Sequence, residues 1–510
     1  MFNNAFDWML NKDHRELAEL YDYLHSFQQS KYTRAELEDG LGWSTYKVQT
    51  YVSRLMEDID NNFDDQAQTL SWSADGKYVV VDGLKNADAA LLRTLYAKEA
   101  LPARFLMQGI THDLPNLQEF AEKNNVSLST AQKILRELRQ HYDLDGISIN
   151  TRFQIIGNEL GIRYWLHQYF YNMHAADAIP DELSVYTFSP ELVAELITLL
   201  GEFDIELSNL DKVRLQYSMN VIGLRIRTGH FVTKEQLGPW GKNLDQLDAH
   251  QQAGIAGMQK AFKKAYPALT DEDAYCEAVY NWTVFHILYT LQEDGFWQNH
   301  PMMAVYLQVI KTGRADFEAA FGVPIIDYQT AQIGERLFTN IMHFLFVKQA
   351  IPRTDCGEAF GTAEHPILSY VVSKILEHQA QILGVSAKQI KLSLFNEVLV
   401  TFLSSLDMKK LMEPVYIYVD FSEKATMRDF VINKIKNTAY MHEVFVDNVD
   451  DADIIISDTK LAIPPSRAFV IWSVMPNEKQ WNRFEQRLRA ITVAKFNAKH
   501  HANAQMLIEN

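Results

Sequence analysis

Cysteine is nearly absent from this sequence, which has only Cys276 and Cys356 and no C-x-x-C motif. A disulfide framework or a thiolate metal site needs several cysteines at short spacings, so both are excluded. Residues 1–10 contain no basic segment followed by an apolar one, and no apolar run reaches the roughly 18 residues of a membrane-spanning helix. We therefore expect a soluble, cytoplasmic protein without a membrane partner.

The common signatures of catalytic and cofactor sites are also missing. The sequence has no G-x-G-x-x-G, no G-x-x-x-x-G-K-[ST], no H-E-x-x-H and no G-x-S-x-G. Carboxylates are abundant, as in any chain with a net charge of −17, and their positions form no catalytic pattern. The sequence thus predicts a protein that is not an enzyme and binds no cofactor or metal ion.

A surplus of positive charge is the third absence. The net charge of −17 argues against nonspecific binding to nucleic acid, for which a basic surface is expected. Specific binding to DNA is still possible, because only the face that contacts DNA has to be positive.

What the sequence does contain is a helix-turn-helix pattern near its start. Thr33 and Glu36 have the spacing of a capping box, and the short helix that they begin ends near Gly42. Ser44 then caps a second helix, in which Val48, Val52 and Leu55 would face inward. Two helices joined by a tight, glycine-containing turn are typical of a helix-turn-helix.

The same pattern recurs 83 residues further along the chain. A first helix at residues 117–121 is followed by a turn at Asn124 and Asn125, and Ser127 caps the next helix. Ala131, Leu135 and Leu138 would be the buried residues of this helix, matching those of the first unit one for one. Each unit ends in a predicted β-hairpin wing, the first over residues 72–82 with a turn at Asp75-Gly76 and the second over residues 147–157.

The outward faces of the two second helices carry hydroxyl, amide and cationic side chains, which suit base edges and phosphates in the major groove. We therefore predict that double-stranded DNA is bound by Ser44, Thr45, Lys47, Gln49, Thr50, Arg54, Ser129, Thr130, Gln132, Lys133 and Arg136.

A family resemblance appears directly after the second wing. Gly157, Glu159, Ile162 and Arg163 form the pattern G-x-E-x-x-I-R. This resembles the junction before the regulatory helices of transcription factors controlled by the sugar phosphotransferase system (PTS). The layout of the whole chain resembles the Mga/AtxA-type regulators of Gram-positive bacteria. The resemblance implies transcription activation, often of virulence or carbohydrate-linked genes, a homo-oligomer, and control by histidine phosphorylation.

With this resemblance, the expected fold is multidomain and mainly α-helical. Five segments are predicted: winged helix-turn-helix domains at 1–85 and 86–166, all-helical PTS regulation domains at 167–297 and 298–408, and a small α/β domain similar to enzyme IIB at 409–510. The two helical segments share internal similarity, since residues 215–225 parallel 337–347 and residues 280–291 parallel 395–406.

Regulation domains of this family accept phosphate on histidine from PTS phosphocarrier proteins. His286, followed by Ile287, resembles the His-Ile pair of such domains, and His343 lies in the repeated helix. His230 and His365, near helix ends, are further candidates. The sequence departs from the family pattern at Ser218 and Asn220 in the first repeat and at Thr401 in the second. We expect Arg225 and Arg227 to receive a phosphoryl group on His286.

The last segment alternates strands and helices, which predicts a small parallel sheet. Strands are expected at residues 415–419, 443–446, 453–456 and 468–471, and helices at residues 426–436 and 477–490. Enzyme IIB carries a phosphate-accepting cysteine after its first strand, whereas this sequence has Asp420-Phe421-Ser422-Glu423 there. We therefore expect a module for homodimer formation instead of a phosphocarrier.

Two other functions are compatible with parts of the pattern. An RNA-binding antiterminator shares the regulation domains, but such proteins begin with a β-rich RNA-binding domain, and this chain begins with predicted helices. A phosphotransfer or interaction protein is the other alternative, and the missing cysteine counts against it.

Overall fold

The computed structural model describes residues 6–500 except for 28, 64–68, 85, 112–113, 115, 143–146, 174–189, 243, 245–246, 290–294, 299, 348–364, 422–424, 438–440 and 460–466. This part of the chain is mainly helical, as predicted, and carries a small sheet near its C-terminal end. It divides into two compact units. The first comprises residues up to Met303 and the end of one helix from Met342, and the second comprises the rest.

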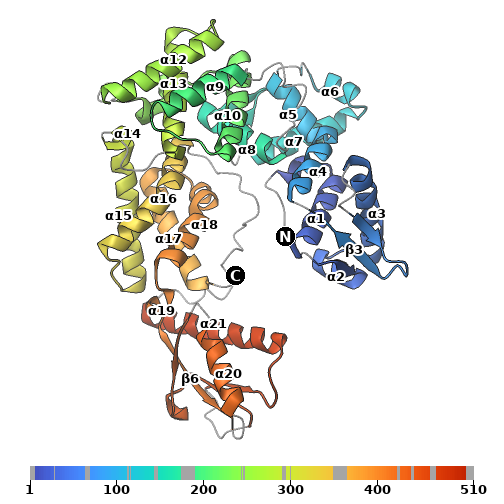
Figure 1. The fold of residues 1–510 in the computed structure, drawn as a ribbon, viewed down its shortest axis with the longest axis vertical. Helices are drawn as coiled ribbons and strands as arrows, with labels where there is room; N and C mark the ends of the chain where they lie inside the picture. Colours follow the sequence, from blue (N-terminus) through green and yellow to red (C-terminus); the bar gives the residue numbers. More distant parts are fainter. Residues whose placement is uncertain are drawn as a thin grey trace. The chain divides into compact units, whose positions relative to one another are not determined.

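The first unit begins with a helix-turn-helix domain that carries a β-sheet (Figure 1). Its sheet is antiparallel with the strand order β1-β3-β2, and Thr69 to Trp72 pair with Asp82 to Val79 to form the predicted wing. Gly76 at the hairpin turn has φ +67°, a backbone conformation that glycine adopts without strain. The elements of this domain are α1 (Lys12–Phe27), β1 (Lys31–Thr33), α2 (Arg34–Leu41), α3 (Thr45–Asn62), β2 (Thr69–Trp72) and β3 (Tyr78–Asp82).

A short segment ahead of α1 joins this domain to elements much further along the chain. Phe6 is fully buried, with its ring 5.4 Å from that of Trp165 in an edge-on contact. Trp8 stacks on His141 at 3.9 Å between ring centroids. Asp7 accepts a 2.9 Å hydrogen bond from Nε of Arg93. Sequence periodicity could not reveal this segment, because its contacts come from tertiary packing alone.

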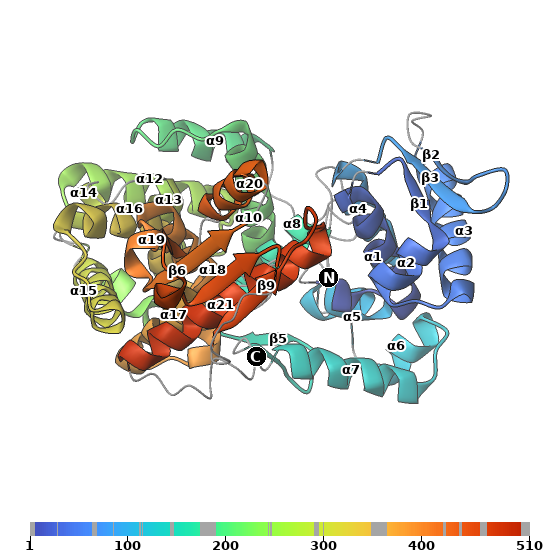
Figure 2. The same cartoon turned by 90° about the horizontal axis from the view of Figure 1, so that it is seen from below.

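The second helix-turn-helix domain has the predicted elements in the predicted order. Figure 2 shows α6 and α7 meeting at one end of the domain. The wing is the antiparallel pair β4–β5, in which Ile147 lies opposite Gly157. The elements of this domain are α4 (Asn86–Glu99), α5 (Leu101–Thr111), α6 (Leu117–Lys123), α7 (Leu128–Tyr142), β4 (Ile147–Ile149) and β5 (Ile155–Gly157).

The remainder of the first unit is helical. Helix α8 crosses the predicted domain boundary at residue 166, so the second helix-turn-helix domain and the helices after it share one continuous element. Helix α10 packs against α8, and α12 packs against α13. These helices are α8 (Glu159–Met173), α9 (Pro190–Gly201), α10 (Asn209–Arg227), α11 (Lys234–Leu237), α12 (Ala249–Ala265), α13 (Asp271–Tyr289) and α14 (Gly295–Gln298).

A second set of long helices follows, consistent with the predicted helical repeat. Helices α17 and α18 pack together as α12 and α13 do. The predicted boundary at residue 298 does not coincide with the limit of a compact unit, because α16 contributes its end from Met342 to the first unit. The helices are α15 (Pro301–Phe321), α16 (Asp327–Val347), α17 (Pro366–Leu383), α18 (Ala387–Ser405) and α19 (Met408–Leu411).

The C-terminal domain is the predicted small parallel sheet, with the strand order β7-β6-β8-β9. Helices α20 and α21 lie side by side, with Nζ of Lys434 4.3 Å from the ring centroid of Trp481. Helix α21 ends ten residues later than predicted, and the loop residues Ser422 and Glu423 lie outside the described residues. The elements are β6 (Pro414–Asp420), α20 (Ala425–Lys436), β7 (His442–Phe445), β8 (Ile454–Ser457), β9 (Ala468–Ile471) and α21 (Glu478–His500).

Among the described residues, no helix combines the length and the apolar character that a membrane crossing requires. The same residues contain no group of three or more histidine, cysteine, aspartate or glutamate side chains suited to a metal ion.

Candidate nucleic-acid interface

The first helix-turn-helix is built by the predicted caps. The side chain of Thr33 accepts a hydrogen bond from the backbone N–H of Glu36, whose carboxylate accepts one in return from the N–H of Thr33 at 2.7 Å. Gly42 ends α2 in the left-handed conformation, and Ser44 caps α3 by accepting a 3.3 Å hydrogen bond from the N–H of Lys47. These local contacts fix where α3 starts and therefore which of its side chains face outward.

The predicted inner face of α3 is confirmed, because Val48, Val52 and Leu55 are fully buried. On the opposite face Thr45 and Gln49 are exposed. Thr50 is half-buried, and its hydroxyl donates a 2.9 Å hydrogen bond to the carbonyl of Tyr46 within the same helix.

Both cations predicted to bind DNA from α3 are paired with acidic residues of α1. Nζ of Lys47 lies 2.9 Å from a carboxylate oxygen of Glu16 and 4.1 Å from the ring centroid of Trp43. Nη1 of Arg54 donates a 3.0 Å hydrogen bond to Asp13 and thereby lowers the pKa of that carboxyl group. These contacts neutralise both positive charges. The sequence could not show this, because the acids lie more than thirty residues away.

The second helix-turn-helix differs in this respect, although its local construction is the same. Asn125 adopts φ +53° in the turn, and Ser127 caps α7 by accepting a 3.1 Å hydrogen bond from the N–H of Thr130. Ala131, Leu135 and Leu138 are buried, as predicted.

The outward face of α7 exposes Gln132, Lys133 and Arg136. Lys133 retains 65% exposure of its side chain, and its ion pair is with Glu137 of the same helix at 3.7 Å. Ser129 is exposed and Thr130 is half-buried, and the hydroxyl of each lies 2.8 Å from that of Ser127. The helix thus presents hydroxyl, amide and cationic groups together on one surface.

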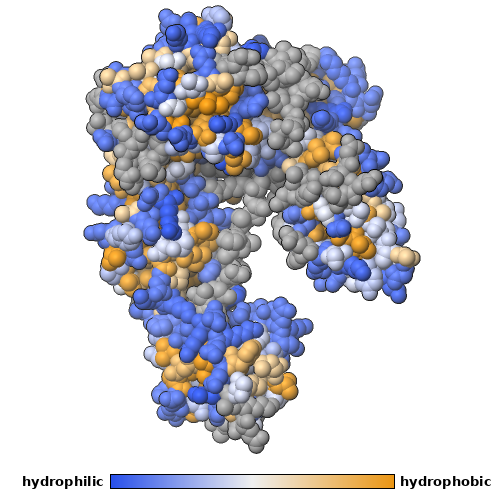
Figure 3. Space-filling view, in the orientation of Figure 1, coloured by the Kyte–Doolittle hydropathy of each residue, from blue (hydrophilic) through white to orange (hydrophobic). Residues whose placement is uncertain are grey.

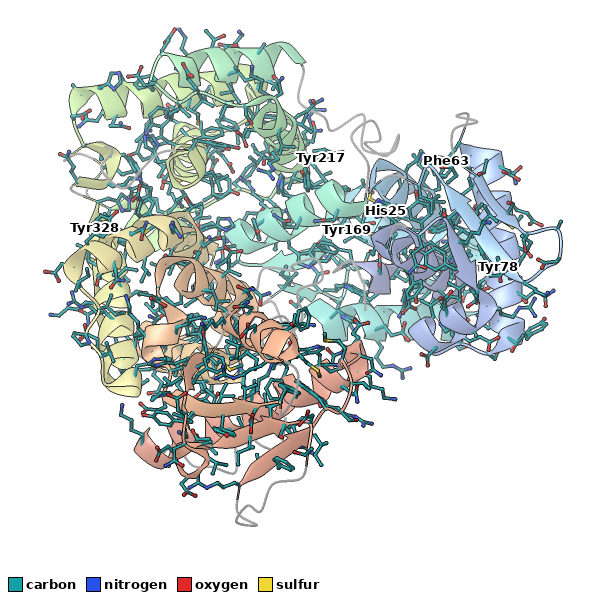
Figure 4. All side chains as sticks on the ribbon, turned by 60° about the horizontal axis from the view of Figure 1, so that its bottom comes forward. His25, Phe63, Tyr78, Tyr169, Tyr217 and Tyr328 are labelled. Carbon is teal, nitrogen blue, oxygen red and sulfur yellow. The ribbon has the colours of Figure 1, made fainter. Side chains whose placement is uncertain are left out.

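The wings add polar and aromatic groups beside these helices. Lys77, at the tip of the first wing, is exposed, and Tyr78 follows it on β3 (Figure 4). In the second wing, Arg139 of α7 donates a 3.3 Å hydrogen bond to the carbonyl of Ile149, which ties the helix to β4. Arg152, in the turn between β4 and β5, is exposed.

A buried cluster of four charges lies directly behind the second wing. The guanidinium of Arg163 contacts Glu159 at 3.0 Å and Glu277 at 2.5 Å. Arg225 donates to both carboxylate oxygens of Glu159, at 2.9 and 2.7 Å. All four residues are at most 4% exposed. Two arginines and two glutamates leave no net charge in this cluster.

This cluster connects the second wing to the helical part of the first unit. Nη2 of Arg225 lies 3.4 Å from the carbonyl of Ile155 in β5, and the N–H of Val232 donates to Glu277 of α13. Burial alone would raise the pKa of Glu159, but the hydrogen bonds and charges of Arg225 and Arg163 outweigh burial and lower it. The junction motif pointed to Glu159 and Arg163. Their partners are distant in sequence and could not be predicted.

The four predicted phosphoacceptor histidines occupy different environments. His286 is 1% exposed, and its Nδ1 lies 2.9 Å from the carbonyl of Trp282. His343 is half-buried, with its ring 4.4 Å from that of Tyr164. His230 and His365 are half-buried, and His365 precedes α17 at its N-terminus.

The two arginines expected to receive a phosphoryl group on His286 lie in different environments. Arg225 is 1% exposed, and Glu159 takes up its guanidinium. Arg227, by contrast, is exposed, with its guanidinium 5.8 Å from the ring centroid of Tyr266.

Comparison with known proteins identifies the class of the second helix-turn-helix. Residues 85–170 match the Mga helix-turn-helix domain, a segment that includes α7, the second wing and the start of the junction. The resemblance to Mga-type transcription regulators is therefore confirmed through this domain.

A particular relative supports the same class. Over 149 residues the chain is 30% identical to a protein of Streptococcus pneumoniae named "Putative trans-acting regulator". The aligned region covers 29% of this chain and 28% of the relative. The likeness thus extends over less than a third of either protein.

Proposed function

We propose that this protein is a sequence-specific, DNA-binding regulator of transcription, with α7 as its principal reading helix. The observation that carries the proposal is the exposed face formed by Gln132, Lys133 and Arg136. It lies on the Ser-capped second helix of the segment that matches the Mga helix-turn-helix domain. Amide and guanidinium groups at such a position can pair with base edges and phosphates.

The acidic total of the chain is compatible with this function, because charge is distributed unevenly within the helix-turn-helix domains. On α3 the two cations are paired with acids of α1. On α7 Arg136 is exposed, and Lys133 remains 65% exposed beside Glu137 of the same helix. The positive surface needed for phosphate contact is therefore local. We assign Thr45 and Gln49 of α3 a secondary, uncharged role in base contact.

Regulation is proposed to follow the family resemblance. The protein would act in the cytoplasm as an activator and as a homodimer joined through residues 409–510, with PTS phosphocarrier proteins as partners. Among the four candidates His343 is favoured as phosphoacceptor over His286, because a phosphorylating protein has to reach the ring and His286 is 1% exposed.

An electrophoretic mobility shift with the full-length chain tests the central claim. Duplexes selected by the protein from a pool with a random 30-base-pair core should bind, and a structured RNA hairpin of equal length should not. Selection that enriches no sequence, or equal binding to the RNA, would refute the proposal.

Two further experiments test the proposed regulation. Light scattering of the full chain tests the dimer. Mass spectrometry after incubation with phosphoenolpyruvate and the general phosphotransferase proteins tests whether His343 is phosphorylated.

A further inference from the structure

Each of the two second helices begins with an exposed apolar side chain. Tyr46 is 80% exposed in the first turn of α3, and Leu128 is 41% exposed at the start of α7. Each lies within two residues of its capping serine, Ser44 or Ser127. The hydroxyl of Tyr46 makes no hydrogen bond within the described part of the chain.

These two side chains share a helix face with the polar side chains proposed to contact DNA. Residues three and four positions apart in a helix are neighbours on its surface. Tyr46 is therefore next to Gln49 and Thr50, and Leu128 is next to Gln132. The row continues to Arg136 one turn further along α7, so that an apolar, an amide and a guanidinium group follow each other.

Tyr46 is more exposed than the aromatic residues that neighbour it in sequence. Trp43 and Tyr51, the other aromatic residues near it in sequence, lie 4.1 and 5.5 Å from the Lys47 ammonium, which is paired with Glu16. They therefore belong to the packing of α3 against α1. Figure 3 shows apolar residues as small, separate groups among hydrophilic ones on the visible face of this domain. On that visible face, these groups form no large apolar patch of the kind that marks a protein-binding site.

The major groove offers an apolar group that matches this arrangement. The C5 methyl of thymine is accessible there, and an amide side chain pairs with the N6 and N7 edge of adenine. An apolar side chain one turn before a glutamine therefore suits A·T-containing sequences. We propose that Leu128 and Tyr46 contact thymine methyl groups and so determine part of the sequence specificity. This inference rests on the proposed DNA-binding function.

The test removes the methyl group of the base and leaves the protein side chain in place. The duplex selected by the full-length protein is resynthesised with deoxyuridine in place of every thymidine, and both forms are titrated at one salt concentration. The deoxyuridine duplex should bind more weakly, by about fourfold for each thymine methyl group that the protein covers. Undiminished binding to it would overturn the proposal and leave the proposed function intact. Failure to bind either duplex would overturn both.

Side-chain variants then assign the contacts. Leu128→Ala and Tyr46→Ser should weaken binding to the thymidine duplex and reduce the difference between the two duplexes. Tyr328→Ser is the matched control, because Tyr328 is an exposed aromatic residue (73% exposed) on α16, outside the helix-turn-helix domains, and this variant should keep the full difference. If both helix variants discriminate between the duplexes as the wild type does, the assignment to these residues is wrong.

Discussion

The two helix-turn-helix domains have matching local sequences and different surface electrostatics. Both second helices start at a serine cap and bury three aliphatic residues at equivalent positions. On α3, however, Lys47 and Arg54 are paired with Glu16 and Asp13 of another helix. On α7 Arg136 is exposed, and Lys133 is 65% exposed and pairs only with Glu137 of its own helix. The comparison teaches that helix-turn-helix geometry and the charge of the helix surface are separable. The positive charge that a second helix can offer to DNA phosphates depends on whether a neighbouring helix supplies acidic partners, as α1 does for α3.

The domains also differ in how they are held. Behind the second wing lies the four-charge cluster of Glu159, Arg163, Arg225 and Glu277, whose net charge is zero. Between the two domains, Arg93 of α4 contacts two carboxylates, those of Asp7 and of Asp22 on α1, which leaves one negative charge in excess. Four predictions test these differences, from the largest expected effect to the smallest.

The Glu277→Gln substitution should have the largest effect, because it leaves Arg163 buried with too little negative charge. Breaking a buried ion pair costs about 3–5 kcal/mol. We expect hydrogen exchange to accelerate in β4 and β5 and in α8, while β2 and β3 of the first wing keep their protection. Glu272→Gln is the matched control, since Glu272 lies on the same helix in an exposed pair with Lys234. Equal loss of protection from hydrogen exchange in both wings would show that the buried cluster stabilises both domains and not the second one alone.

The double substitution Lys133→Ala/Arg136→Ala should weaken DNA binding on the order of a hundredfold, because two contacts of about 1–3 kcal/mol each are removed. The slope of log affinity against log salt should become shallower by about 2. Lys123→Ala controls for the loss of an exposed cation elsewhere in the domain, at the end of α6. An unchanged salt slope in the double variant would mean that α7 does not contact phosphate.

Acidification should destabilise the cluster around Glu159 and stabilise the cluster around Asp22. The pKa of Glu159 is lowered by its arginine partners, so the stability that it contributes is lost as the pH falls below the ordinary glutamate value of 4.5. The pKa of Asp22, which contacts Arg93 of α4, is raised by burial, so this carboxyl group takes up a proton in the folded chain before it does in the unfolded chain, and the fold gains stability. The carboxyl groups of Asp13 and Glu16 on α1 have lowered pKa values, but their pairs with Arg54 and Lys47 are partly exposed and contribute little. Hydrogen exchange at pH 7 and pH 4, corrected for intrinsic rates, should therefore show loosening first at the second wing. Loosening that begins at α1 would contradict the comparison.

The smallest effect is expected for Lys47→Ala/Arg54→Ala. Both cations are already paired with acids of α1, so their removal should change DNA affinity by less than about threefold and leave the salt slope nearly unchanged. Partly exposed ion pairs contribute about 0–1 kcal/mol, so a small loss of stability is expected. If this variant loses as much affinity as the α7 variant, the pairs with α1 must open when DNA binds.

Local sequence signals were sufficient for much of the fold. Capping at Thr33, Ser44 and Ser127 and the aliphatic spacing after each cap depend on neighbours within one or two helical turns, so they could be predicted. The small parallel sheet was predictable for the same reason, since each strand forms its own apolar run. The end of α21 was underestimated because no glycine or proline marks it.

Contacts between distant segments could not be predicted. The pairing of Lys47 with Glu16 depends on how α1 packs against α3. The pairing of Arg225 with Glu159 joins residues that are 66 positions apart in the sequence. The exposure of Tyr46 does not follow from its residue type, because tyrosine occurs both in cores and on surfaces. Its position beside the outward-facing Thr45 was the available signal.

The segment ahead of α1 also bears on how the protein can be dissected. Phe6 contacts Trp165 and Tyr169 of α8, and Trp8 covers His141 at the end of α7. The second helix-turn-helix domain is thus completed by residues from the opposite end of the first, and a fragment cut at its sequence limits would uncover the buried rings of Trp165 and Tyr169. As a module it is discontinuous, and a transplantable version would need residues 6–10 grafted onto residues 86–173.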